Sequence, residues 1–225
     1  MRVLSGRAAT IDADRERTAT MLARTAETGE PAVRVWRPHR QVAFGRRDAI
    51  ESGYDRARAA ARDRGFDPVE REVGGRAAAY TGSTLAFARV VPVDDARTGL
   101  DDRYETASDR LQRALSRLGV AATSGEPPES FCPGSHSLQA DGKLVGIAQR
   151  VRSDAALVAG CVVVADREEL ASVLAAVYDA LDQPFDPASV GSVAAAGGPA
   201  DPERVRTAVE RELVGDAATV RRIAV

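Results

Sequence analysis

The chain is poor in residue types that usually hold small domains together. Its 225 residues include two cysteines, two histidines and only 4% aromatic residues. Cys132 and Cys161 are too few for a disulfide framework, and together with His39 and His136 they lack the spacing of a zinc site. We therefore predict no structural metal site, and a core built mainly from alanine, valine and leucine.

Long apolar runs and a strong charge imbalance are also missing. No stretch approaches the roughly 20 apolar residues that span a bilayer, and residues 1–17 lack the apolar centre of a signal peptide. The formal net charge of −2, without a polybasic run, argues against a general binder of nucleic acid or anionic membranes. We therefore expect a cytoplasmic protein with one substantial core and no nucleic-acid or membrane partner.

Lysine is almost absent, since Lys143 stands alone against thirty arginines. Nearly every cation has become arginine, as GC-rich coding favours, so the remaining lysine indicates a position that needs an ammonium. An ammonium is a compact point charge on a flexible stem, whereas a guanidinium is a planar fork. A compact cation suits a phosphate or carboxylate in a tight pocket. A single lysine can also survive by chance, so its surroundings must decide.

The spacing of apolar residues predicts an α+β fold, with a mixed, mostly antiparallel sheet and helices packed on it. Helical periodicity covers residues 11–28, 52–64, 100–118, 167–181 and 202–213. Strand patterns cover residues 32–36, 41–45, 68–73, 85–93, 138–148 and 155–164. The sequence contains neither a P-loop nor a G-x-G-x-x-G motif between a strand and a helix, which excludes the usual nucleotide-binding folds.

Two tight turns are predicted between neighbouring strands. The Pro-His-Arg sequence at residues 38–40 predicts a hairpin between the strands on either side of it. Asp141 and Gly142 form a typical hairpin turn, and Lys143 follows them directly. Lys143 should therefore begin a strand.

Helix ends and the last connection also have sequence signals. Thr10 or Asp12 is predicted to cap the first helix, and Asp166 the helix that begins after it. Residues 184–201 are rich in alanine, glycine and proline, which predicts a surface connection to the last helix.

Two segments, residues 71–82 and 141–150, combine glycines with a cation. Consecutive glycines such as Gly74 and Gly75 remove Cβ atoms, so backbone N–H groups can approach an anion or a carbonyl oxygen closely. The small residues 77–79 leave room for a ligand beside them. Taken alone, the glycine pair is better explained as a turn, and the pairing with the lysine strand is what favours a ligand site.

Together these segments resemble the catalytic domain of the lipoate-protein ligase family, within the wider biotin and lipoate ligases. The family's first motif, an arginine before a glycine-rich stretch, is matched by Arg71, Gly74 and Gly75. Its second motif, a Lys-x-x-Gly-x-Ala strand, is matched by Lys143, Gly146 and Ala148. The resemblance extends from about residue 31 to residue 164 and implies a fold like that of class II synthetases and biotinyl and lipoyl ligases. It also implies a catalytic domain over residues 1–183, with residues 184–225 as a connection and helix packed on it.

The resemblance implies an enzyme that uses ATP and Mg²⁺ to activate lipoate as lipoyl-AMP. The lipoyl group would then pass to a lysine on a carrier domain of a 2-oxoacid dehydrogenase or glycine cleavage complex. Lys143 would contact the α-phosphate and the activated carboxyl group, because fixed donors stabilise the charge that builds on these oxygens. The substrate-binding residues implied are Arg71, Gly74, Gly75, Arg76, Ala77, Ala78, Ala79, Tyr80, Gly146 and Ala148.

The chain departs from the family pattern at three places. Arg76 stands where a third glycine is usual, Tyr80 and Thr81 replace His-Asp, and an alanine at position 159 replaces the histidine of a common His-Gly pair. The length also leaves no room for the accessory domain of some ligases, so a separate accessory chain is a possible partner.

Two alternatives remain open. Octanoyltransferases of the same fold use a cysteine nucleophile before the lysine strand, and Cys132 resembles that residue, although it lies closer to Lys143 than usual. Cys132 and Lys143 are therefore the predicted catalytic residues, with His136 as a residue that could orient the thiol, while Cys161 is predicted to lie in the core. The other alternative is a non-catalytic family member that binds lipoyl compounds.

Overall fold

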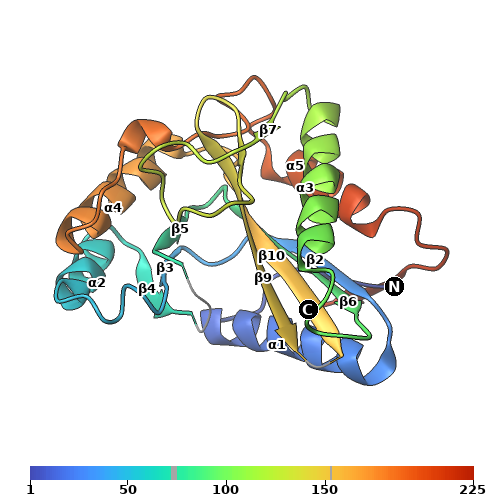
Figure 1. The fold of residues 1–225 in the computed structure, drawn as a ribbon. Helices are drawn as coiled ribbons and strands as arrows, with labels where there is room; N and C mark the ends of the chain where they lie inside the picture. The colour runs from blue at the N-terminus through green and yellow to red at the C-terminus, as the bar shows by residue number, and fades with distance from the viewer. Residues whose placement is uncertain (72–74, 153) are drawn as a thin grey trace.

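The computed structural model describes residues 1–71, 75–152 and 154–225 (Figure 1). In these residues the strands form two sheets. The larger has the order β11-β1-β2-β6-β10-β9-β8-β7, and the smaller the order β4-β3-β5. Strand β1 runs parallel to β11 and β2, and β3 runs parallel to β4, while the other pairs are antiparallel. The predicted α+β class with a mixed, mostly antiparallel sheet is confirmed.

The strands of the larger sheet are mostly short, and the central ones are the longest. The strands of this sheet are β1 (Arg2–Ser5), β2 (Ala32–Trp36), β6 (Leu85–Pro92), β7 (Thr123–Ser124), β8 (Leu138–Gln139), β9 (Lys143–Arg152), β10 (Ala155–Val162) and β11 (Arg221–Ala224). The strands of the smaller sheet are β3 (Gln41–Phe44), β4 (Asp67–Glu70) and β5 (Ala78–Tyr80). Strand β11 had no clear signal in the sequence.

Helices cover both faces of the larger sheet. The helices are α1 (Ile11–Thr28), α2 (Tyr54–Arg62), α3 (Leu100–Arg117), α4 (Arg167–Ala180), the short η1 (Pro187–Ser189) and α5 (Pro202–Val214). Because side chains alternate along β6, Leu85 and Phe87 pack with α3 and α5, whereas Ala88 and Val90 pack with α1 on the opposite face. Helices α2 and α4 pack together beside the smaller sheet (Figure 1). No helix in the described ranges is both long and apolar enough to cross a bilayer.

The first helix has the boundaries that its sequence predicts. Thr10 is the N-cap, and its hydroxyl accepts a hydrogen bond from Ala13 N at 3.2 Å. Gly29 ends the helix in the left-handed conformation with φ 68°. For α4, Asp166 is the N-cap residue as predicted, but it has φ 54° and its side chain makes no capping hydrogen bond.

The hairpin predicted around residues 38–40 is wrong. Strand β2 lies in the larger sheet between β1 and β6, whereas β3 crosses to the smaller sheet and pairs with β4 and β5. The proline-containing segment restricts the backbone locally, but it does not choose the hydrogen-bonding partners. Long-range packing made that choice, since both strands are mostly buried.

The connection over residues 184–201 is also not simply a surface segment. Residues 189–193 are buried, and Val190 forms a β-bridge with Lys143. Gly191 N donates to Lys143 O at 3.1 Å. A Cβ on Gly142, which has φ 111°, would lie 2.6 Å from Gly191 N. The turn before Lys143 therefore requires glycine, and the late connection holds the start of β9 in place.

Candidate active site

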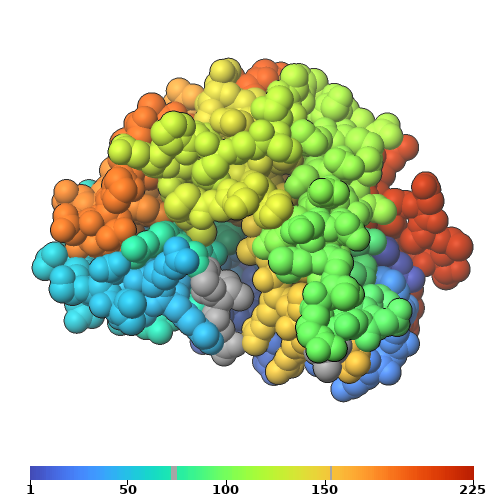
Figure 2. Space-filling view, in the orientation of Figure 1, coloured from blue at the N-terminus to red at the C-terminus, as the bar shows by residue number. Residues whose placement is uncertain are grey.

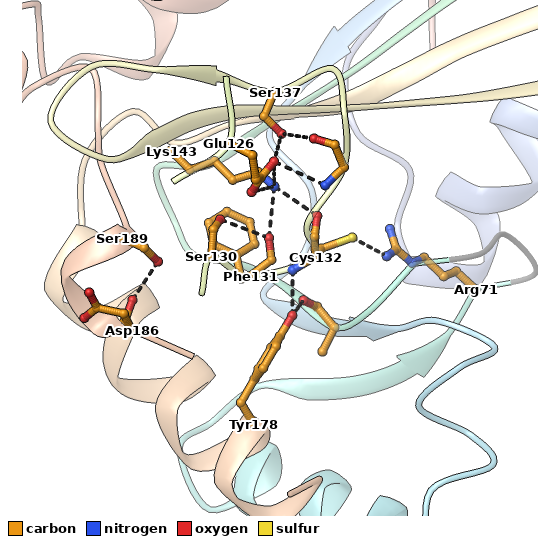
Figure 3. Close-up of polar contacts among 12 residues, drawn as sticks. Arg71, Glu126, Ser130, Phe131, Cys132, Ser137, Lys143, Tyr178, Asp186 and Ser189 are labelled. Atoms are coloured by element: carbon orange, nitrogen blue, oxygen red, sulfur yellow. Dashed lines mark hydrogen bonds and ion pairs between the residues drawn. The ribbon is translucent and has the colours of Figure 1, made fainter. Parts of the chain in front are cut away.

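Lys143 begins β9, as predicted, and its side chain is buried with 1% exposure. Its ammonium lies 2.8 Å from Glu126 Oε1 and 3.1 Å from Glu126 Oε2. It also donates to the carbonyl oxygens of Phe131 and Cys132, both at 2.9 Å (Figure 3). A buried charge is tolerated when it is paired and hydrogen-bonded. An ammonium has three N–H donors, so these four contacts leave none of them free.

Glu126 is the site residue that the sequence analysis missed. Besides Lys143, its Oε2 accepts from Gly134 N at 3.2 Å and from the hydroxyl of Ser137. Glu126 therefore closes the loop of residues 125–137, here named the Cys132 loop, onto the lysine (Figure 3). No signal in the sequence marks it, since Glu129 lies in the same loop and acidic loop residues are ordinary.

Cys132 is held through its backbone on both sides. Its carbonyl accepts from Lys143, and its N–H donates to Tyr178 Oη at 2.6 Å. The Tyr178 hydroxyl in turn donates to Ala77 O at 3.0 Å. Burial raises the pKa of Tyr178, so this phenol stays protonated and able to donate. Cys132 has φ 43°, a left-handed conformation that non-glycine residues rarely adopt, and these contacts hold it there.

The Cys132 thiol faces Arg71. The distance from Arg71 Nη2 to Cys132 Sγ is 2.9 Å (Figure 3). The same nitrogen donates to Arg76 O at 2.5 Å. Burial acts to lower the pKa of Arg71, but the neighbouring Cys132 and Tyr80 outweigh it, so the pKa lies above its ordinary value. A contact of this kind is charge-assisted when the sulfur is a thiolate.

Gly75 makes room for the contact between Arg71 and Cys132. Its φ is 96°, and a Cβ there would lie 2.9 Å from both Cys132 Sγ and Arg71 Nη2. The glycine of the first motif is therefore required by the close approach of a thiol and a guanidinium. Gly74, the other predicted glycine, lies outside the described residues.

An apolar cavity of about 220 Å³ lies beside Arg71. Tyr80, Phe87, Ala148 and Gly160 line it together with Arg71, and residues of α1 line it as well. Figure 2 shows the molecule hollowed between the α2 side and the strands β9 and β10. Arg71 therefore both lines the cavity and contacts the Cys132 sulfur.

The other predicted substrate-binding residues have different surroundings. Ala77, Ala78 and Ala79 are buried in the core cluster around α4. The Arg76 guanidinium pairs with Glu51 at 2.7 Å and with Asp48 at 3.4 Å. The structure thus brings Arg71, Tyr80 and Ala148 to the cavity but keeps the three alanines out of it.

Gly146 lies next to the lysine side chain and not in the cavity lining. A Cβ on Gly146 would lie 3.5 Å from Lys143 Cε and 3.9 Å from Cys161 Sγ. The glycine of the second motif therefore provides space along the lysine stem.

Both histidines lie away from the thiol contacts. The His136 ring stacks on Tyr104 with centroids 3.8 Å apart, which ties the Cys132 loop to α3. His39 Nε2 lies 2.9 Å from Ala8 O. Within the described part of the chain, no group of three or more histidine, cysteine, aspartate or glutamate side chains is arranged to hold a metal ion.

The two thiols are expected to differ sharply in reactivity. Cys161 is buried in β10, and burial raises the pKa of its thiol, whereas Cys132 is only partly buried. At about pH 8, iodoacetamide should therefore modify Cys132 and leave Cys161 intact until the protein is unfolded. Peptide mass spectrometry of the folded and urea-unfolded protein measures this, and equal modification of both thiols in the folded protein would contradict the assignment.

A model of the lipoyl protein ligase A/B catalytic domain matches residues 16–214. The chain belongs to this family. The predicted membership of a lipoate-protein ligase-like enzyme family is therefore confirmed.

The curated proteins to which the chain is similar include acyltransferases. An octanoyl-[GcvH]:protein N-octanoyltransferase of Exiguobacterium sibiricum is 33% identical over 136 residues, which covers 58% of this chain and 48% of that protein. A lipoyl-[GcvH]:protein N-lipoyltransferase of Listeria monocytogenes is 28% identical over 119 residues, covering 52% and 43%. The chain matches these curated relatives over about half of their length.

Solved structures share the fold over the whole chain. A lipoate-protein ligase A bound with ATP has a TM-score of 0.79 at 21% identity and is covered over 88% of its length. A Thermoplasma acidophilum protein with bound lipoic acid has a TM-score of 0.72 at 21% identity, with 89% of its length covered. The ligase-like fold predicted from the resemblance is therefore confirmed.

Proposed function

We propose that the chain is an acyltransferase that carries an octanoyl or lipoyl group as a thioester on Cys132. The acyl group would come from one lipoyl-carrier protein and pass to a lysine of another, as the names of the curated relatives indicate for those proteins. The observation that carries the proposal is the 2.9 Å contact between Arg71 Nη2 and Cys132 Sγ beside an apolar cavity.

The chemistry needs two exchanges at one carbonyl carbon. The thiolate attacks the acyl-lysine amide, the C–S bond forms, the C–N bond breaks, and the leaving amine takes up the proton that the thiol released. The neutral amine of the second carrier then attacks the thioester, a new C–N bond forms, the C–S bond breaks, and the proton that the amine loses is taken up by the leaving sulfur. The Arg71 guanidinium, 2.9 Å from the sulfur, supplies the positive charge that stabilises the thiolate as it attacks and as it leaves.

The cations that the resemblance assigned to ATP are already paired. Lys143 contacts Glu126, Arg76 contacts Glu51 and Asp48, and Arg71 contacts Cys132. None of these three cations is left unpaired to bind the phosphates of Mg²⁺-bound ATP. The proposed transfer uses no ATP, because it exchanges one acyl-lysine amide for another and the overall reaction is therefore close to thermoneutral.

We also propose that residues 184–225 belong to the same catalytic unit as residues 1–183. Val190 and Gly191 contact the backbone of Lys143, and α5 packs against α3. A chain that ended at residue 183 would lose these supports of the site.

The test is transfer of an octanoyl group from a loaded carrier protein to an unloaded one, with and without ATP. We expect transfer without ATP and a hydroxylamine-labile acyl adduct on the enzyme. The ATP-dependent ligase hypothesis predicts instead lipoate-dependent exchange of pyrophosphate into ATP and no transfer without ATP. Tight binding of acyl compounds with no turnover would favour the non-catalytic alternative. Either of these results would overturn the proposal.

A further inference from the structure

The ion pair between Glu126 and Lys143 lies beside the thiol, but the thioester chemistry does not require a carboxylate there. Both oxygens of Glu126 lie within 3.1 Å of the ammonium, and the two side chains are 20% and 1% exposed. The carboxylate approaches from the Cys132 loop, from the side on which the carbonyls of Phe131 and Cys132 also lie (Figure 3).

A phosphate oxygen that bound Lys143 would need the position that the Glu126 carboxylate occupies. It would also meet the negative charge of that carboxylate at close range, where partial burial weakens solvent screening. Moving Glu126 aside would leave Gly134 N without its acceptor and the Ser137 hydroxyl with only the longer contact to Gly134 O at 3.4 Å. The pair thus disfavours an external anion by occupancy, by charge and by coupling to the loop.

We propose that Glu126 is a specificity-determining residue that excludes nucleotide phosphates from Lys143. The Glu126 carboxylate acts as an internal anion for the ammonium. Lys143 then binds only Glu126 and the backbone of the Cys132 loop, and the site favours acyl transfer through a thioester over adenylation. This inference rests on the proposed function, since it explains why a ligase-like fold would transfer acyl groups without ATP. It predicts that removal of one carboxylate charge creates an anion site.

The experiment is calorimetric titration of Glu126→Gln with ATP and, separately, with inorganic pyrophosphate. We expect both to bind at least about tenfold more tightly than to the wild type, because the ammonium is then uncompensated. Glu129→Gln is the matched control, since it removes the same charge from an exposed position of the same loop and should leave both affinities unchanged. The double variant Glu126→Gln with Lys143→Met should return to the wild-type affinity.

Three results would overturn the inference: tight ATP binding by the wild type, no gain in a folded Glu126→Gln, or an equal gain in Glu129→Gln. If Glu126→Gln melts below the assay temperature, Glu126→Ser is titrated in its place and read by the same criterion. The acyl adduct of the wild type is measured separately. If the wild type forms no acyl adduct while Glu126→Gln still gains ATP affinity, the proposed function is wrong. If the wild type forms the adduct and also binds ATP tightly, only this inference is wrong.

Discussion

Acyl transfer is expected to fall by at least about a thousandfold when Cys132 is replaced by serine, because the change removes the nucleophile on which the thioester forms. The variant should fold normally, since Lys143 and Tyr178 hold the backbone of this residue and not its sulfur. Initial rates of octanoyl transfer between two carrier proteins, measured alongside a thermal melt, check both parts of this expectation.

The matched control is Cys161→Ala. Cys161 is 6% exposed in β10, pairs with Gly146 across the sheet, and has no step in the proposed mechanism. We expect transfer to stay within about threefold of the wild type, with only the modest loss of stability that removal of a small buried group causes. Retained activity in Cys132→Ser, or loss of activity only in Cys161→Ala, would exclude the thioester on Cys132.

Lys143→Met is expected to lower the free energy of unfolding by about 2 to 4 kcal/mol. This loss is smaller than the roughly 3 to 5 kcal/mol expected for a fully buried ion pair, because Glu126 is 20% exposed and can be partly solvated. The variant leaves the Glu126 carboxylate without its cation and frees the carbonyls of Phe131 and Cys132. Urea unfolding measures the stability, and the rate of Cys132 alkylation reports the position of the thiol; both should change.

Arg89→Met is the control for a partly buried cation elsewhere in the sheet. Arg89 lies in β6, where it pairs with Val33 and Val158, and its side chain donates to Leu213 O at 3.2 Å. The Arg89→Met variant should be somewhat less stable than the wild type, and its Cys132 should be alkylated at the wild-type rate. If Lys143→Met kept the wild-type stability and alkylation rate while losing ATP-dependent activity, Lys143 would act on phosphate, as the ligase hypothesis states.

Much of the fold follows from local sequence patterns. The caps at Thr10 and Gly29 and the regular apolar spacing define α1 at the predicted residues, and the Asp-Gly turn places Lys143 at the start of β9. The pairing of strands does not follow from these patterns. Alternation predicts a strand but not the sheet that it joins, which is why the predicted hairpin of β2 and β3 is wrong.

The site was predictable only where a residue type was unusual. The single lysine, the cysteine ahead of it and the glycine-flanked Arg71 all had signals, and the structure places them within one network. Glu126 and Tyr178 had no such signal, because an acidic loop residue and a tyrosine on a helix are ordinary in sequence. Their roles arise from the folding of the Cys132 loop against β9 and α4.

The central claim is that Cys132 becomes acylated during turnover. Its most direct test is to mix the enzyme with an octanoyl-loaded carrier protein without ATP, to quench within one turnover, and to locate the octanoyl group by peptide mass spectrometry. Our account predicts the group on the Cys132 peptide, its removal by hydroxylamine and its transfer when an unloaded carrier is added. An unmodified Cys132 in a reaction that still transfers the acyl group would contradict the account.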